Sequence, residues 1–161
     1  MNTSNNPLEG GRLAEILLVE DNENDAELTR LAFRRSGLTV SLHHVRDGEE
    51  CMAFLRKQGK FASAPDPDLV LLDLNMPRMD GRAVLAEVVG DKNLCHLPIV
   101  VLSTSSQHRE ALDIYKLRCN SYIVKPIEFD QFVNVIRTVC QYWFGVVVLP
   151  SETAKRTSQV F

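Results

Sequence analysis

Short apolar segments alternate with amphipathic ones along most of the chain, and this alternation restricts the possible fold more than any other feature. Uninterrupted apolar runs of this kind are typical of strands that are buried on both faces of a sheet. We expect five such strands, at Ala14–Val19, Thr39–Val45, Leu69–Leu72, Pro98–Leu102 and Tyr122–Val124.

The segments after these strands carry apolar residues at helical spacing. Gly37 is expected to end the first helix, and Ser105 or Ser106 to cap the fourth. A loop rich in proline and small residues is expected at Gly59–Pro67. The expected helices are Asn24–Arg35, Glu49–Gln58, Ala83–Val89, a helix ending near Leu117, and a long last helix whose core face carries Phe129, Phe132, Val133, Ile136, Val139, Cys140 and Trp143.

Strict alternation of strands and helices leaves few possible architectures. Right-handed crossovers that cover both faces give an α/β fold, a doubly wound parallel sheet of five strands with helices on both faces. The 161 residues suit one compact domain with a full hydrophobic core.

The composition is that of an ordinary globular protein, with 45% hydrophobic and 24% charged residues. The formal net charge of -3 gives no reason to expect nucleic acid or an anionic membrane as a partner. No stretch approaches the roughly 20 apolar residues that would span a bilayer. Residues Met1–Gly11 lack the pattern of a secretory signal, so we expect a cytoplasmic location.

The cysteines and histidines do not indicate a metal site. The four cysteines are scattered without a CxxC pair, so we expect them to be reduced and mostly buried. His43 and His44 are adjacent on an expected strand and would point to opposite faces. His96 and His108 are expected at the surface.

Charged and hydroxyl side chains stand where the expected strands end. Glu20 and Asp21 follow the first strand, Asp73 the third, Ser103 the fourth and Lys125 the fifth. In an open parallel sheet, ligands bind beyond the carboxyl ends of the strands. These side chains are therefore expected to converge on one site.

Three carboxylates placed so close together repel one another unless a cation lies among them. Oxygen ligands with room for water suit Mg²⁺. We expect Asp21 and Asp73 to be direct ligands, together with the backbone carbonyl of Asn75, and Glu20 to act through a bound water.

This arrangement suits phosphoryl transfer to Asp73. An aspartate is already ionised at neutral pH and can attack phosphorus without a separate base. Lys125 and the Ser103 hydroxyl are expected to hold phosphoryl oxygens. Asp73 is the expected nucleophile because it lies centrally, between Asp21 and Lys125. Each residue alone would be an ordinary turn, loop or capping residue, so the joint placement carries the prediction.

With these residues in place, the sequence resembles a response-regulator receiver domain of the chemotaxis-regulator type. The matching stretches are ILLVEDN (Ile16–Asn22), LVLLDLNMPRMDG (Leu69–Gly81), PIVVLSTS (Pro98–Ser105) and SYIVKP (Ser121–Pro126). The resemblance covers Ala14–Trp143. It implies a flavodoxin-like sheet of strand order 2-1-3-4-5, and a histidine kinase that donates the phosphoryl group to Asp73.

The resemblance also assigns further roles. Ser103 would be the switch hydroxyl, Tyr122 the aromatic residue that turns inward on activation, and Gly81 a structural residue of the site. The Lys125–Pro126 peptide bond is expected to be cis. In such domains the residues at Asn75 and Ser105 often tune hydrolysis of the phosphoryl group. Two positions depart from the common pattern, since Asp is frequent where Glu20 stands and Thr where Ser103 stands.

A narrower resemblance links the chain to the stand-alone regulators of cyanobacterial phytochromes. It rests on Val19–Phe33 (VEDNENDAELTRLAF), Gly59–Leu69 (GKFASAPDPDL) and Tyr142–Pro150 (YWFGVVVLP). It implies a light-sensing histidine kinase of the phytochrome type as the partner.

We expect residues 1–12 to be a flexible segment, 13–145 the receiver domain, and 146–161 a tail without an effector domain. Output must then pass through binding of another protein. Apolar residues beyond the core face of the last helix need cover. Either this segment folds back onto its own domain, or it forms a homodimer through the last two helices and the strand between them. We predict the dimer, even without phosphorylation. The residues concerned are Val135, Tyr142, Phe144 and Val146–Leu149.

Three other functions remain to be weighed. A phosphatase of the haloacid-dehalogenase type needs a second acid two residues after the nucleophile, where this chain has Asn75. A flavodoxin needs a phosphate loop rich in Ser, Thr and Gly after the first strand, where this chain has Glu20–Asp25. A pseudo-receiver would not keep the acids and Lys125. We therefore expect a signalling phosphoacceptor that catalyses only its own phosphorylation and dephosphorylation.

Overall fold

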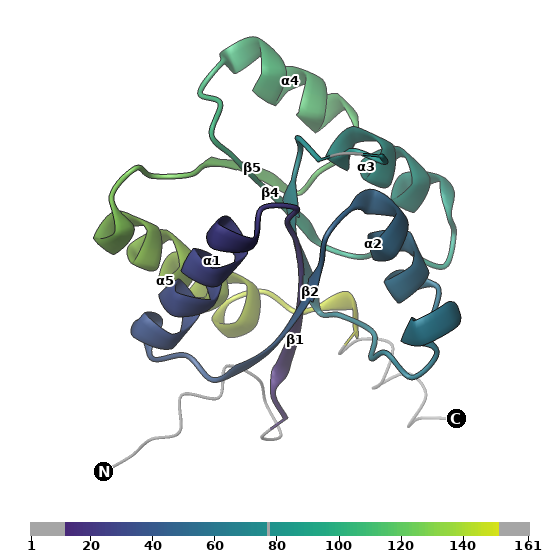
Figure 1. Cartoon of the computed structure of the whole chain (residues 1–161), viewed down its shortest axis with the longest axis horizontal. Helices are drawn as coiled ribbons and strands as arrows, with labels where there is room; N and C mark the ends of the chain where they lie inside the picture. The colour runs from purple at the N-terminus through teal and green to yellow at the C-terminus, as the bar shows by residue number, and fades with distance from the viewer. Residues whose placement is uncertain (1–11, 77, 152–161) are drawn as a thin grey trace.

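The protein, described here from a computed structural model over residues 12–76 and 78–151, is built around one parallel sheet. Its strands pair in the order β2-β1-β3-β4-β5, and all pairs are parallel, which confirms the expected flavodoxin-like topology (Figure 1). The strands are β1 (Ala14–Val19), β2 (Val40–Val45), β3 (Leu69–Asp73), β4 (Ile99–Ser103) and β5 (Ser121–Val124).

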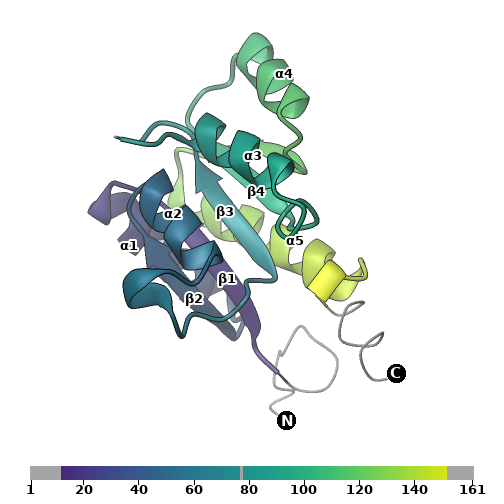
Figure 2. The same ribbon diagram turned by 90° about the vertical axis from the view of Figure 1, so that its right-hand side faces the viewer.

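Helices cover both faces of the sheet, as predicted (Figure 2). Helices α1 and α5 pack against each other on one face, and α2, α3 and α4 contribute to the apolar cluster of the other face. Neighbouring residues of a strand serve opposite clusters, because side chains alternate along a strand. The helices are α1 (Glu23–Ser36), α2 (Gly48–Leu55), α3 (Gly81–Gly90), α4 (His108–Lys116) and α5 (Phe129–Gly145), with a short 3₁₀ helix, η1, at Gly59–Phe61.

Several helix termini differ by one to three residues from the sequence prediction, and two of these differences have a clear local cause. Helix α2 ends at Leu55 rather than Gln58, because Lys57 takes a left-handed backbone conformation with φ of 55°. Neither Ser105 nor Ser106 caps α4. Gln107 occupies the cap position without a side-chain hydrogen bond, and the Ser105 hydroxyl instead accepts the Gln107 N–H within the preceding loop. The expected end of α1 is confirmed, since Gly37 has φ of 77°.

The segment after α5 partly folds back onto its own domain. Phe144 and Leu149, which the sequence analysis assigned to an exposed patch, are buried in the cluster beneath α1 and α5. The Ser151 hydroxyl donates a hydrogen bond of 2.6 Å to Asp68, and Asp68 also pairs with Arg12 at 2.7 Å. The prediction that Phe144 and Leu149 belong to an exposed patch was therefore wrong. Most of the proposed end segments, residues 1–11 and 152–161, lies outside the described residues.

The cysteines and histidines behave as the sequence indicated. Cys95 is exposed, the other three cysteines are buried, and all four are free. His43 and His44 have different partners: the first lies 2.6 Å from the Glu15 carboxylate, and the second contacts the Glu20 carbonyl. Over the part of the chain that the structure describes, no helix is long and apolar enough to cross a membrane.

Candidate phosphoacceptor and metal site

The register of the sheet brings the ends of four strands to one edge. Asp73, the last residue of β3, pairs with Leu102, and Ser103, the last residue of β4, pairs with Val124 at the end of β5. Strand β1 ends beside β3 on the other side. The side chains that follow or end these strands therefore lie at the carboxyl edge, where parallel sheets bind ligands.

Three carboxylates meet at this edge. Oxygen atoms of Glu20, Asp21 and Asp73 all lie within 4.8 Å of one another. Glu20 is buried, Asp73 is half-buried and Asp21 is exposed, so the cluster opens to solvent on one side. Within residues 12–76 and 78–151, no other group of His, Cys, Asp and Glu side chains comes together in this way.

Lys125 supplies a positive charge inside the cluster. Its ammonium donates a hydrogen bond of 2.9 Å to the Glu20 carboxylate, and its side chain is only 16% exposed. Its backbone N–H donates to the Ser103 carbonyl at 2.7 Å, which fixes the start of the loop after β5. Glu20 is thus the contact that Lys125 makes here, whereas the sequence analysis had matched it with a phosphoryl group on Asp73.

The cluster carries more negative than positive charge, with three carboxylates and one ammonium. Burial raises the pKa of Glu20 to about 7, although the neighbouring Lys125 ammonium lowers it. Burial also raises the pKa of Asp73, against the opposing effects of Lys125 and of the Asn75 N–H, which donates to Asp73 at 3.3 Å. One ammonium does not compensate three carboxylates.

The donor set fits a divalent cation such as Mg²⁺. The oxygens are all hard ligands, they are close enough to share one ion, and the exposed side of Asp21 leaves room for water. A bound cation would also favour the ionised carboxylates and so lower the two pKa values that burial raises. The expected carbonyl ligand, Asn75, follows Asp73 by two residues in the loop before α3.

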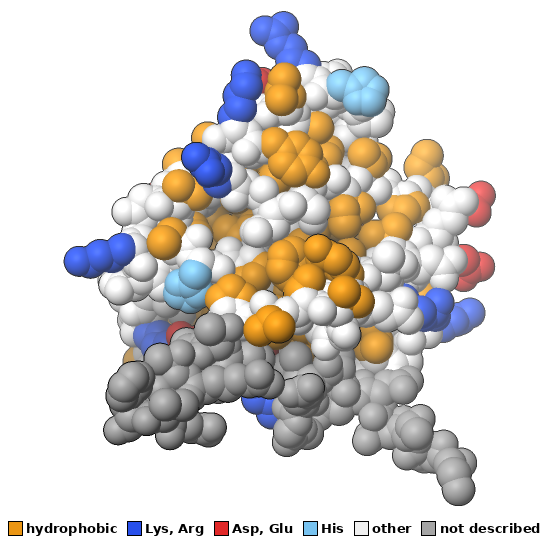
Figure 3. Space-filling model, turned by 180° about the vertical axis from the view of Figure 1, so that it is seen from behind, with side chains coloured by type: hydrophobic (Ala, Val, Ile, Leu, Met, Phe, Trp, Pro, Cys, Tyr) orange, Lys and Arg blue, Asp and Glu red, His pale blue; other side chains and the backbone are white. Residues whose placement is uncertain are grey.

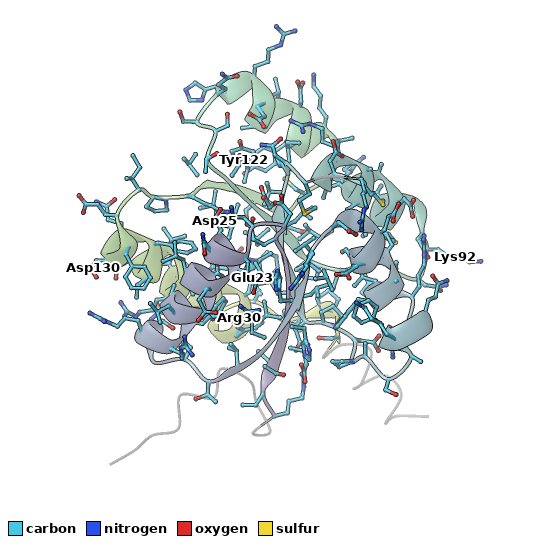
Figure 4. The ribbon with its side chains drawn as sticks, viewed as in Figure 1. Glu23, Asp25, Arg30, Lys92, Tyr122 and Asp130 are labelled. Carbon is cyan, nitrogen blue, oxygen red and sulfur yellow. The ribbon has the colours of Figure 1, made fainter. Side chains whose placement is uncertain are left out.

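Ser103 and Tyr122 lie at the same edge but make their contacts with the loop between β4 and α4. The buried Ser103 hydroxyl accepts the Ser105 N–H at 3.1 Å. The Tyr122 hydroxyl donates to the Ser105 carbonyl at 2.9 Å, and Figure 4 shows Tyr122 on β5 below α4. Both side chains thus hold one loop, although neither has a described hydrogen bond to Asp73.

Gly81 has a steric role beside Asp73. A Cβ atom at Gly81 would lie 2.5 Å from the Asp73 carbonyl oxygen and 2.8 Å from the Leu74 Cα. Helix α3 therefore approaches the end of β3 only because residue 81 lacks a side chain. The Gly81 N–H closes the loop by donating to the Leu74 carbonyl at 3.0 Å.

The expected cis peptide bond is absent. The bond between Lys125 and Pro126 is trans, as are the other described peptide bonds. An X–Pro bond prefers trans by only about 0.5–1 kcal/mol, so local contacts decide the isomer and the dipeptide alone does not. With the trans bond, the Lys125 ammonium still reaches Glu20.

Sequence analysis missed the residues that hold Glu20 from the neighbouring strand. The His44 Nε2–H donates to the Glu20 carbonyl at 2.7 Å, while the Glu20 N–H donates to the Val45 carbonyl at 3.0 Å. On its other side, the His44 ring lies 3.1 Å from the Arg30 guanidinium, which makes Nδ1 the acceptor. Only the pairing register of β1 with β2 could have indicated this role.

A cavity of about 670 Å³ lies far from this chemistry, at the other end of the strands. Prolines and leucines form much of its wall, together with Asp68 and Ser151. It contains none of the carboxylates of the cluster, so the acidic edge is the candidate site.

Comparison with known proteins finds relatives that match most of the chain. The family model described as "Response regulator receiver domain" matches residues 16–137. A curated relative, "Response regulator Rcp1" of Synechocystis sp. (strain ATCC 27184 / PCC 6803 / Kazusa), is 38% identical over 136 residues, which are 84% of this chain and 92% of the relative.

Solved structures resemble the whole described domain. The phosphorylated cyanobacterial phytochrome response regulator RcpA is 41% identical with a TM-score of 0.80, and the match covers 86% of this chain and 99% of that one. The Mn²⁺-bound form of Rcp1 is 35% identical with a TM-score of 0.75, over 84% of this chain and 99% of that one.

Proposed function

This chain belongs to the response regulator receiver domain family, and from its acidic edge we propose that Asp73 accepts a phosphoryl group from a histidine kinase. The observation that carries the proposal is the grouping of Glu20, Asp21 and Asp73 within 4.8 Å, with the Lys125 ammonium at 2.9 Å from Glu20.

The reaction is an in-line displacement at phosphorus. An oxygen of the Asp73 carboxylate forms a bond to the phosphorus atom, and the bond from phosphorus to the imidazole nitrogen of the donor breaks. The electron pair of that bond leaves with the imidazole, which takes up a proton from water. The product is an acyl phosphate on Asp73.

Residues of this chain would hold both the metal ion and the phosphoryl group. Asp21 and Asp73, with the Asn75 carbonyl, would hold Mg²⁺, and Glu20 would act through water. When bound, the ion neutralises charge on the carboxylates and on the phosphoryl group. The Lys125 ammonium leaves Glu20 and pairs with a phosphoryl oxygen, while the Ser103 hydroxyl donates to another. The half-buried position of Asp73 limits the approach of water.

Hydrolysis returns the site to its first state. Water attacks the phosphorus atom, the bond to Asp73 breaks, and inorganic phosphate leaves the restored carboxylate. The same residues serve both directions, so the protein would catalyse its own phosphorylation and dephosphorylation without acting on other substrates. Asn75 and Ser105, each two residues beyond Asp73 and Ser103, would tune the lifetime of the phosphoryl group.

The proposed donor is a phytochrome-type histidine kinase in the cytoplasm. Support comes from the names of the relatives, since RcpA is a cyanobacterial phytochrome response regulator. Exposed apolar residues beside the acidic edge offer a docking surface for such a partner: Leu28 and Leu31 on α1, and Ile127 in the loop after β5. Apolar groups that border a charged site are typical of protein contacts.

Activation would move the loop after β4. The Ser103 hydroxyl, which now accepts the Ser105 N–H, would turn to the phosphoryl oxygen. This movement would loosen the contact of the Tyr122 hydroxyl with the Ser105 carbonyl and let the ring turn inward. Phosphorylation would then shift the equilibrium between two conformations of this loop and α4.

Output would pass through a homodimer formed by α4, β5 and α5. Figure 3 shows hydrophobic side chains gathered on this side of the molecule. The exposed ones include Leu112 and Tyr115 on α4, Val124 on β5, Tyr142 on α5, and Val146 and Val148 after it. Phe144 and Leu149 are no longer part of the surface, because they are buried.

The test of the proposal is phosphorylation by a small donor. Wild type and Asp73→Asn are incubated with acetyl phosphate and Mg²⁺, and their intact masses are compared. Wild type gains the mass of one phosphoryl group and the variant does not. An unchanged wild type, or an equal gain in the variant, refutes the proposal. Chelation of Mg²⁺ should abolish the gain.

A further inference from the structure

The loop between β3 and α3 carries the Asn75 carbonyl, and its first part is anchored by Leu74 and Met76, which are buried in the core. Inside the site it is tied by the Asn75 N–H, which donates to Asp73 at 3.3 Å. Where it joins α3 it is closed by the hydrogen bond from Gly81 to Leu74. The outer part, Arg78 and Met79, needs a support from elsewhere.

That support comes from residues 44–48, which span the end of β2 and the start of α2. Arg78 donates to the Asp47 carboxylate at 3.0 Å, and the Gly48 N–H donates to the Met79 carbonyl at 2.9 Å. A Cβ atom at Gly48 would lie 2.6 Å from the Met79 Cγ, so the loop reaches this position only because residue 48 is glycine.

Asp47 joins two structures at once. One of its oxygens accepts the Glu50 N–H at 2.8 Å and caps α2, and the other accepts Arg78. The Asp47 side chain is only 6% exposed, whereas the Arg78 side chain is 69% exposed. A buried carboxylate needs a charge partner, so the pair holds Arg78 against α2.

The backbone of Arg78 agrees with such a tether. Its φ of 64° lies in the left-handed region, which a residue with a side chain rarely adopts. Glycine would suit this conformation better. The unfavourable backbone conformation of Arg78 is offset by its side-chain contact with Asp47.

The same segment also holds the other acidic loop. His44 and Val45 bind the backbone of Glu20, and Asp47 and Gly48 bind the loop that follows Asp73. Residues 44–48 contribute no expected ligand, yet they contact both loops that do. We propose that residues 44–48, through the Asp47–Arg78 ion pair, position the Asn75 carbonyl for the divalent cation.

This inference rests on the proposed function, and its test measures the metal directly. Mn²⁺ and Mg²⁺ are titrated calorimetrically into wild type, Arg78→Gln, Arg78→Gly and Asp47→Asn. Each variant should bind the metal roughly 10-fold more weakly, at the low end of the range for residues that orient a metal ligand. The Asp47→Asn change keeps an oxygen for the Glu50 N–H.

A matched control is Arg56→Gln. Arg56 pairs with Glu87 at 2.9 Å between α2 and α3 and does not contact the loop, so its loss should leave the affinity unchanged. The double variant Asp47→Asn/Arg78→Gln should bind no more weakly than either single variant, because both remove one interaction.

Further readouts separate positioning from general damage. With acetyl phosphate, the Arg78 variants should need more Mg²⁺ for half-maximal rate but reach the wild-type maximum within about twofold. Amide hydrogen exchange should speed up at Asn75, Arg78 and Met79, and not in β4. Equal metal affinity in wild type and the Arg78 variants would overturn the inference alone. A wild type that binds no metal would refute the proposed function itself.

Discussion

At the scale of single residues, the acidic edge combines a buried carboxylate with a single ammonium group. Glu20 is buried with a pKa raised by that burial, and Lys125 is its partner at 2.9 Å. The proposed reaction needs this ammonium at Asp73 instead. Glu20 therefore holds Lys125 close to Asp73 while no phosphoryl group is present, and a phosphoryl group offers the stronger partner.

The raised pKa of Glu20 predicts how stability depends on pH without metal. The folded protein binds a proton at Glu20 up to about pH 7, whereas the unfolded chain releases it near 4.5. Between these values the native state binds more protons, so the free energy of unfolding falls as pH rises. The expected loss is about 1–3 kcal/mol.

Denaturant unfolding in chelator at pH 5 and pH 7.5 measures this loss, with Glu20→Gln as the comparison. The variant should lose less stability than wild type over the same range. Identical pH dependence in the two proteins would show that Glu20 titrates normally. Saturating Mg²⁺ should also reduce the loss in wild type, because a cation binds the ionised carboxylates.

At the scale of elements, a second cluster fastens the opposite end of the sheet. Asp68, just before β3, accepts hydrogen bonds from Arg12, from the Ser151 hydroxyl at 2.6 Å and from the Glu15 N–H at 2.8 Å. It therefore joins the segments before β1 and after α5 to the start of β3. This arrangement explains how Leu149 reaches the core.

Asp68→Asn should lower the free energy of unfolding by about 1–3 kcal/mol at pH 7, because it removes the charge partner of Arg12. Burial alone would raise the pKa of Asp68, but the hydrogen bonds from Arg12, Ser151 and Glu15 outweigh it and hold the pKa below 3.8. The contribution of Asp68 is thus present above pH 3.8 and is lost as pH falls through the lower folded value.

The difference between wild type and Asp68→Asn should accordingly shrink in acid, as measured by denaturant unfolding. Asp66→Asn is a matched control two residues away. Its side chain is 80% exposed and pairs only with Lys57 at the surface, so its loss should change stability by less than about 0.5 kcal/mol. An equal effect of the two substitutions would contradict the role of Asp68.

The sequence was sufficient to predict the strands and the edge where the acids meet, because buried parallel strands are continuous apolar runs. The strand order came from the resemblance to receiver domains. Helix termini were less predictable. The end of α2 depends on the backbone of Lys57, and the start of α4 on a loop that Ser105 and Tyr122 hold. Leu149 is buried two residues before Ser151, whose hydroxyl binds Asp68, a residue distant in the sequence.

Contacts around the site show the same division. Asp73, Glu20 and Asp21 could be predicted, because each stands directly at a strand end. The pairing of Arg78 with Asp47 could not, since it joins two loops with no periodic pattern. The isomer of the Lys125–Pro126 bond was predicted wrongly, because it rested on resemblance and the free-energy difference between isomers is small.

At the scale of the whole molecule, the proposed function assigns different roles to two sides of the surface. The acidic edge would receive the kinase, and the side formed by α4, β5 and α5 would carry the output. Tyr142 and Val146 are more than half exposed there, although the core face of α5 is buried. Contiguous apolar surface of this kind is uncommon on monomeric proteins and indicates a contact with another molecule.

We predict a dimer at micromolar concentration without phosphorylation, with a mass by light scattering near twice 18.1 kDa. Tyr142→Glu should shift the protein to a monomer, because it places a charge in the proposed interface. Val89→Glu on α3 is the control, since Val89 is 43% exposed on another side and its change should leave the mass unaltered. A monomeric wild type would contradict the proposed interface.

The central claim concerns one bond, from Asp73 to phosphorus, and locating that bond tests it most directly. After treatment with acetyl phosphate and Mg²⁺, borohydride reduces an aspartyl phosphate to homoserine, and peptide mass spectrometry identifies the altered residue. We expect homoserine at position 73 in wild type and nowhere in Asp73→Asn. Homoserine at Asp21 or at another acid, or none at all, would contradict the account.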